Sequence, residues 1–150
     1  MTPSKTRTIR LQVFVHASPR KAFKAISEPK RLSRWLVDEA TISLRKGGRY
    51  SFKWEGGPTH TGRVLEFVRG KSITLTWQWP GQEEFVTTRL KMSIEGKEDG
   101  AILKFTHTGF PKQERWLDLY TGSIQGWTYF LMNFKSVLDH RHDLRSKNDW

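Results

Sequence analysis

The chain has 150 residues, a formal net charge of +11, 13% aromatic residues and no cysteine. This length fits one domain with a buried core, and the lack of cysteine excludes disulfides and thiol chemistry. No apolar run approaches the ~20 residues that span a bilayer, and residues 1–8 show no secretory signal. We therefore expect a cytoplasmic protein with a single domain over residues 1–150 and short disordered ends near 1–6 and 144–150.

The first third of the chain predicts one strand followed by two short helices. Apolar side chains alternate along residues 8–16, as in a strand with one buried face. Ser18 followed by Pro19 has the order of a helix N-cap and a first helical residue, which predicts a helix over 19–27. A second short helix is expected over 29–36, because the residue before Pro29 disfavours helical geometry and breaks the two apart.

Further strand-like segments follow, separated by turns rich in glycine, proline or charge. The segments lie near 41–44, 48–55, 59–69, 71–79, 83–95 and 100–109. The alternation in 59–69 is interrupted near Glu66, which predicts a β-bulge. Short turns between successive strands are typical of an antiparallel meander.

The last predicted element is a long amphipathic helix near 113–140. Its apolar side chains recur at spacings of three and four, at Trp116, Leu119, Tyr120, Ile124, Trp127, Phe130, Leu131, Phe134, Val137 and Leu138. A stripe this broad must be buried, and the sheet is the surface available to it. The sequence therefore predicts an α+β helix-grip fold, with a curved antiparallel sheet of about six to seven strands wrapped on the C-terminal helix.

Six segments in this order match a known family pattern: ASPRKAFKAISEPKRLSRWL (17–36), KGGRYSF (46–52), GRVLEF (62–67), SITLTWQW (72–79), AILKFTHTGF (101–110) and GWTYFLMNFKSVL (126–138). Together they resemble the START-like, or SRPBCC, superfamily. Within it the chain is similar to the branch homologous to the C-terminal domain of the heat-shock-protein-90 ATPase activator. The resemblance implies the helix-grip fold. Among other members are lipid carriers, polyketide cyclases and hydrophobic-hormone receptors.

Aromatic residues between sheet and helix form the candidate ligand site. The candidate residues are Trp35, Tyr50, Phe52, Trp54, His60, Trp77, Trp79, Phe105, His107, Phe110, Trp116, Tyr120, Ser123 and Trp127. We expect them to surround an enclosed cavity for a small hydrophobic or aromatic molecule, without a cofactor. Small residues at 122, 123 and 126 leave room beside the helix stripe. The alternative is that the same aromatic side chains simply fill the core.

An enzyme, such as a cyclase or hydrolase acting on an aromatic or polyketide-like substrate, is a second hypothesis. His107 is its one candidate acid or base, although a buried structural histidine would fit the same pattern. Glu55, Asp118 and the acids at 83–84 are expected outside the cavity or in turns, so no pair of carboxylates is predicted there. We expect no metal site, because His140 and His142 are two residues apart and would diverge on a helix.

Positive charge is concentrated at the start of the chain, where residues 1–34 hold nine Lys or Arg and one acid. The two short helices carry Arg20, Lys21, Lys24, Lys30, Arg31 and Arg34, which their apolar residues force outward. Such a basic face is suited to an acidic protein partner of the chaperone type, and it also fits a solvated surface. No motif of a nucleic-acid-binding fold accompanies it, so nucleic acid is not the expected partner.

Overall fold

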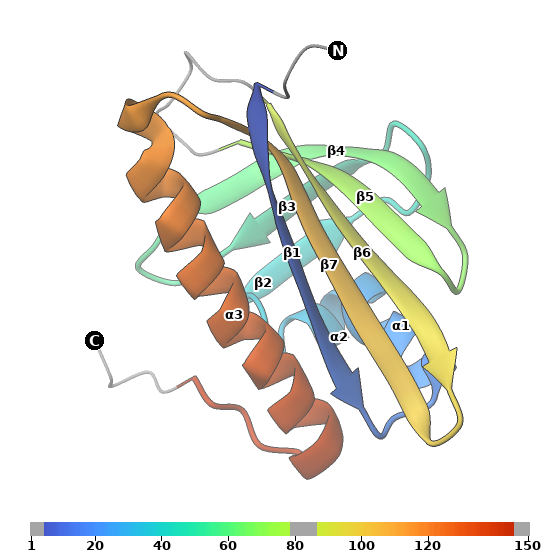
Figure 1. Ribbon diagram of the computed structural model, residues 1–150. Helices are drawn as coiled ribbons and strands as arrows, with labels where there is room; N and C mark the ends of the chain where they lie inside the picture. Colours follow the sequence, from blue (N-terminus) through green and yellow to red (C-terminus); the bar gives the residue numbers. More distant parts are fainter. Residues whose placement is uncertain (1–4, 79–86, 146–150) are drawn as a thin grey trace.

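One antiparallel sheet bends around a long helix in the computed structural model, which describes residues 5–78 and 87–145 (Figure 1). The strand order across the sheet is β1-β7-β6-β5-β4-β3-β2. The strands are β1 Thr6–Val15, β2 Glu39–Ile42, β3 Arg49–Lys53, β4 Thr59–Val68, β5 Ser72–Trp77, β6 Thr88–Lys97 and β7 Gly100–Pro111. This arrangement confirms the predicted α+β helix-grip architecture.

The helices are α1 Pro19–Ser27, α2 Pro29–Leu32, the 3-10 turn η1 Glu114–Trp116, and α3 Leu117–His140. The Ser18 hydroxyl accepts a hydrogen bond from the Lys21 backbone N–H at 3.2 Å, so Ser18 is the N-cap of α1 as predicted. Glu28 has extended geometry before Pro29 and separates α1 from α2. The second helix is shorter than the predicted range of 29–36, because the chain continues as turns after Leu32.

Most of the predicted boundaries lie within a few residues of the observed ones. The register of β4 against β5 shifts between Val64 and Glu66, which confirms the predicted bulge. The strand predicted over 83–95 is observed from Thr88, and residues 79–86 lie outside the described part of the chain. The C-terminal helix begins as η1 and becomes α-helical at Leu117, a few residues after its predicted start near 113.

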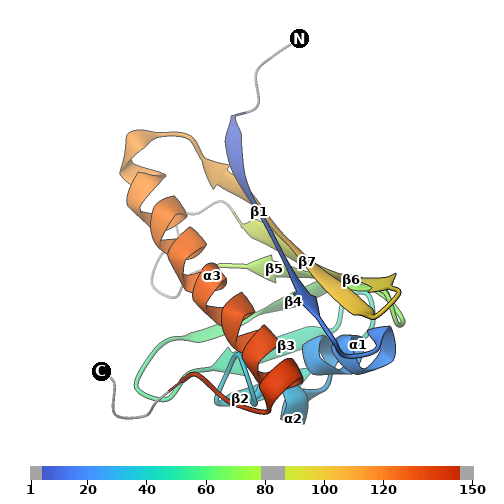
Figure 2. The ribbon, with the colours of Figure 1, turned by 60° about the horizontal axis from the view of Figure 1, so that its bottom comes forward.

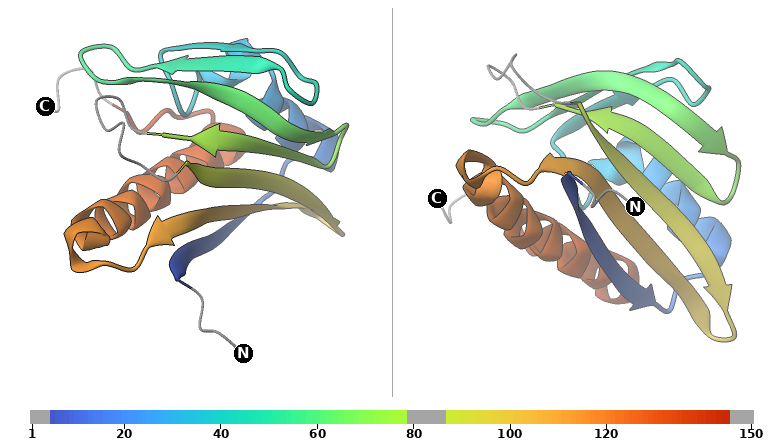
Figure 3. Two further views of the ribbon diagram at one scale, coloured as in Figure 1. Left: turned by 90° about the horizontal axis from the view of Figure 1, so that it is seen from above. Right: turned by 45° about the horizontal axis from the view of Figure 1, so that its top comes forward.

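The part of α3 from Trp127 onward packs more closely than the part before it. The helix lies alongside β1, and α1 and α2 lie near its C-terminal end (Figure 2). Its buried residues are Trp127, Leu131, Asn133 and Phe134, whereas Leu119, Tyr120 and Ile124 are only partly buried. The sheet bends between β1 at one edge and β2 at the other (Figure 3). The part of α3 before Trp127 therefore lies away from the densest part of the core.

Candidate functional site

Trp77 of β5 is the centre of an aromatic cluster on the inner face of the sheet. Its ring centroid lies 5.2 Å from that of Trp127 in α3, 6.2 Å from that of Phe52 and 6.4 Å from that of Trp54. The ring contacts show that these side chains share one face, as alternate residues of neighbouring strands do. The cluster offers large apolar surfaces and the faces of several aromatic rings.

An open cleft of about 1150 Å³ lies between this aromatic cluster and the N-terminal half of α3. The connection from β3 to β4 forms one side, residues 118–130 of α3 form the other, and the α2–β2 loop and the segment after α3 close one end. This volume is large enough for a drug-sized molecule, for which pockets of about 300–1,000 Å³ are typical. The sequence predicted an enclosed cavity, whereas this one opens to solvent because α3 leaves the first half of its apolar stripe only partly covered.

The cleft brings together some of the predicted ligand residues. Those that line it are Trp54, His60, Trp77, Ser123 and Trp127. Those that lie in the surrounding packing without lining it are Trp35, Tyr50, Phe52, Phe105, His107, Phe110, Trp116 and Tyr120. Trp79 lies outside the described residues. Strand alternation identifies the face on which a side chain lies, but it does not tell which part of that face the helix covers.

Two helical glycines face the cleft without being needed for close packing. Gly122 and Gly126 both line it, and a Cβ atom built on either would meet no heavy atom within 4 Å. Glycine inside a helix costs roughly 0.5–1 kcal/mol relative to alanine. Tight packing therefore does not account for these residues, and their effect is to widen the cleft, as the small residues of this helix predicted.

His107 belongs to a buried chain of hydrogen bonds and lies outside the cleft. The Trp127 indole N–H donates to His107 Nδ1 at 3.1 Å, His107 Nε2 lies 2.8 Å from Thr88 Oγ1, and the Thr88 hydroxyl donates to the Trp77 carbonyl at 2.6 Å. This sequence of donors requires a neutral imidazole with its proton on Nε2. Burial, and next the proximity of His60, lower the pKa of His107 to about 3. A histidine held neutral in this way is suited to a structural role.

His60 reaches the cleft from β4 and lies on the face of Trp77. The two ring centroids are 4.3 Å apart with an interplanar angle of 17°. His60 Nδ1 lies 2.8 Å from the Gln78 carbonyl oxygen, so Nδ1 carries the proton and donates it. Burial lowers the pKa of His60, although the bond to Gln78 opposes this effect. The ring is therefore neutral at pH 7, and Nε2 has a free lone pair for accepting a hydrogen bond.

Acidic side chains also line the cleft, which the sequence did not predict. They are Asp38, Glu55, Asp118 and Asp143, and Arg145 is the basic residue among the lining residues. Glu55 lies in a turn and Asp118 is exposed, as expected, and both nevertheless line the cleft, because the β3–β4 turn and the first turn of α3 flank the same opening. Neither residue carries a local signal for this, since each looks like an ordinary exposed acid in its own element.

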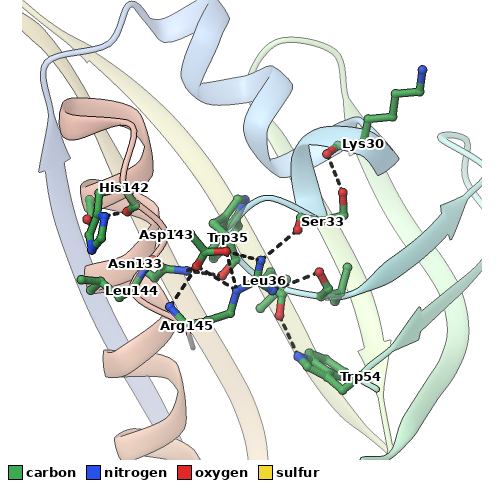
Figure 4. A network of polar contacts seen from close by, with 12 residues as sticks. Lys30, Ser33, Trp35, Leu36, Trp54, Asn133, His142, Asp143, Leu144 and Arg145 are labelled. Carbon is green, nitrogen blue, oxygen red and sulfur yellow. Dashed lines mark hydrogen bonds and ion pairs between the residues drawn. The ribbon is translucent and has the colours of Figure 1, made fainter. Parts of the chain in front are cut away.

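The segment after α3 folds back and closes one end of the cleft (Figure 4). The Leu144 backbone N–H donates to Asn133 Oδ1 at 2.6 Å. The Arg145 guanidinium donates to the carbonyls of Ser33 at 2.9 Å and Val37 at 3.0 Å. These bonds hold the chain against Asn133 and the α2–β2 loop as far as Arg145, and residues 146–150 lie outside the described range. The expectation of short disordered ends near 1–6 and 144–150 stays a prediction.

The predicted basic residues lie on and just after the two short helices. Arg20, Lys21, Lys30 and Arg34 are exposed, and Lys24 and Arg31 are half-buried. Arg34 follows the end of α2. Arg31 makes an ion pair with Glu28 at 3.0 Å, so part of the positive charge is compensated. The exposed basic side chains are therefore accessible from solvent. Binding of an acidic partner to them stays a prediction.

The structure describes residues 5–78 and 87–145, and two statements hold for this part of the chain. Among these residues no group of three or more His, Asp or Glu side chains is arranged to hold a metal ion. No helix in the same part of the chain has the length and apolar character needed to cross a membrane.

Comparison with known proteins identifies the family. Residues 16–139 match the family described as "Activator of Hsp90 ATPase homolog 1-like protein". The chain belongs to this family. The matched residues include the β3–β4 connection and all of the α3 residues that line the cleft. Among the described lining residues, Asp143 and Arg145 lie outside the match. No curated protein matches the chain.

Solved structures show the same fold at low sequence identity. Protein MLL2253 from Mesorhizobium loti has a TM-score of 0.80 at 21% identity, over 92% of this chain and 100% of that one. The Aha1 dimer from Colwellia psychrerythraea has a TM-score of 0.77 at 20% identity, over 89% and 97%. CalU16 from Micromonospora echinospora has a TM-score of 0.66 at 22% identity, over 87% and 77%. Similarity at this level of sequence identity shows that this chain shares its fold with these proteins.

Proposed function

We propose that this family member binds a small apolar or aromatic molecule in the cleft between its sheet and α3. The observation that carries the proposal is a cleft of about 1150 Å³ with Trp54, Trp77 and Trp127 in its walls. A concave site with apolar walls and a few polar groups is the usual form of a small-molecule site. The two glycines that widen it at a cost in helix stability support the same reading.

The arrangement favours binding over catalysis by His107. The side chain is fully buried, and the cleft does not reach it. Its neutral form is held by hydrogen bonds to Trp127 and Thr88, so proton exchange with a substrate would require the core to open. We therefore place the enzyme hypothesis second. Among the described histidines, His60 is the one that lines the cleft.

Filling the cleft from the helix tests the proposed function. Naphthalen-2-ylmethanol serves as the probe, and calorimetric titration measures its affinity. The Gly126→Leu side chain grows into open space, so the variant should fold at least as stably as the native protein and lose most of its affinity for the probe. Gln125→Leu adds the same side chain at an exposed neighbouring position outside the cleft and should bind as the native protein does. Equal affinity in all three proteins would contradict a ligand site in the cleft.

The basic face supports a third candidate function, docking of an acidic protein. Arg20, Lys21, Lys30 and Arg34 are exposed, and Glu28 offsets only its neighbour Arg31. Exposed charges of one sign raise association rates with an oppositely charged surface at low salt. Reversing Lys21 and Lys30 to Glu should abolish capture of acidic partners at low salt and leave binding of the probe in the cleft unchanged. Recovery of the same partners by both proteins would leave this face as solvated surface only.

A further inference from the structure

We infer that the ligand of the cleft carries a positively charged amino group attached to its apolar or aromatic part. The inference rests on the proposed function, because it describes the chemistry of a molecule bound at that same site. It is carried by the sign of the charges around the cleft, by an unused hydrogen-bond acceptor in its wall, and by the aromatic faces between them.

Among the described residues, the charge of the cleft is opposite in sign to that of the whole chain. The chain carries +11, yet the described residues that line the cleft include four acids and one Arg. Arg145 makes an ion pair with Asp143 at 2.9 Å, so these two charges compensate each other. Asp38, Glu55 and Asp118 have no ion pair within the described residues. Lys53 lies beside Asp38 and Glu55 in an adjoining depression, which Glu39, its partner across β2 and β3, also lines.

His60 supplies the polar group in the wall. Its side chain is 5% exposed, and Nδ1 is used in the bond to Gln78. None of the described residues bonds Nε2, and none of them has a fully buried side-chain nitrogen or oxygen without a partner. His60 Nε2 therefore reaches open space. The cleft is the space that His60 lines. A neutral imidazole nitrogen in that position accepts a hydrogen bond from an N–H or O–H group and offers nothing to a carboxylate.

The aromatic side chains fit the same ligand. Trp54 meets the His60 ring edge to face at a centroid distance of 5.6 Å, and Trp77 lies beneath it. Tryptophan faces attract cations within about 6 Å of the ring centroid, and the attraction grows when water is excluded. An ammonium group bonded to His60 Nε2 would meet a lone pair beside Trp54, in a cleft that carboxylates without an ion pair also line. Each of these features favours positive charge over negative.

Three probes with one ring system test the inference: naphthalen-2-ylmethylammonium, naphthalen-2-ylmethanol and naphthalene-2-carboxylate. At pH 7 and low salt the ammonium should bind at least about tenfold more tightly than the carboxylate, with the alcohol between them. Raising the salt concentration to about 0.5 M should narrow this difference, because screening shortens the reach of the rim carboxylates. Calorimetric titration measures all three affinities.

Variants separate the local charges from the net charge. Glu55→Gln with Asp118→Asn removes two rim charges and should weaken the ammonium about three- to tenfold while leaving the alcohol unchanged. Glu98→Gln with Asp99→Asn makes the same net change at the β6–β7 turn, away from the cleft, and should alter neither affinity. His60→Phe keeps an aromatic ring beside Trp77 and should weaken the ammonium and the alcohol, both of which need the acceptor.

The outcomes distinguish this inference from the proposed function. If no probe binds, the proposed function fails and the inference fails with it. If the probes bind but the carboxylate binds as tightly as the ammonium, the cleft remains a ligand site, and the inference that its ligand is positively charged is wrong. Equal losses in the two pairs of charge variants would also overturn the inference, because only the net charge would then matter.

Discussion

The Trp127→Ala variant should lose about 3–5 kcal/mol of unfolding free energy. Trp127 is 6% exposed, and its ring contacts Phe105 at a centroid distance of 4.6 Å and Trp77 at 5.2 Å. Removing the indole deletes this packing and leaves a cavity that joins the cleft, so the surrounding side chains can relax only in part. It also removes the N–H donor to His107. Urea denaturation monitored by circular dichroism measures the loss.

Trp127→Phe is the matched control for this prediction. It retains an aromatic ring against Phe105 and Trp77 but lacks the indole N–H, so its loss should be smaller, near the ~1–3 kcal/mol expected when one buried hydrogen bond is broken. A loss below about 1 kcal/mol for Trp127→Ala would show that the aromatic cluster is loosely packed, contrary to the burial described here.

Acidification from pH 7 to 4.5 should reduce the unfolding free energy by about 2–3 kcal/mol through His107. Its pKa in the folded chain is lowered to about 3, whereas an unfolded histidine titrates near 6.5. Between these values the unfolded chain binds a proton that the folded chain does not, so stability falls as the pH decreases. The lowered pKa of His60 acts in the same direction.

His107→Gln tests the origin of this acid sensitivity. The glutamine amide can accept from Trp127 and donate to Thr88, as the imidazole does, but it does not titrate. The unfolding free energy, measured by denaturation at several pH values from 7 to 4.5, should therefore fall less steeply in the variant. The difference between the two slopes should correspond to about one bound proton. Parallel pH profiles for the native protein and the variant would mean that His107 is not held neutral by the fold.

The fold could be predicted from the sequence because each element carries a local signal. The apolar spacing of α3 extends over more than twenty residues, and its observed bounds are Leu117–His140. Ser18 and Pro19 start α1 as their residue types predict. The alternation in β3 and β5 places Phe52 and Trp77 on one face, where their rings meet.

The shape of the site could not be predicted in the same way, because it depends on how distant elements are placed. The apolar stripe shows which side of α3 faces the core. It does not show that the residues before Trp127 are less deeply buried than those after it. Glu55 and Asp118 meet at one opening although they are far apart in the sequence. The turn at Arg141, which has a left-handed φ of 53°, sends the chain back so that Arg145 reaches Ser33. Nothing in the residues after 140 indicates this return.

The indole N–H signals of tryptophan in a two-dimensional NMR titration test the central claim most directly. With naphthalen-2-ylmethanol as probe, the signals of Trp54, Trp77 and Trp127 should shift and saturate, because these side chains line the cleft. Trp35 is the internal control: it lies outside the cleft, and its N–H donates to the Ala25 carbonyl at 2.8 Å, so its signal should stay unchanged. Shifts confined to Trp35, or none at the three cleft tryptophans, would contradict a ligand site between the sheet and α3.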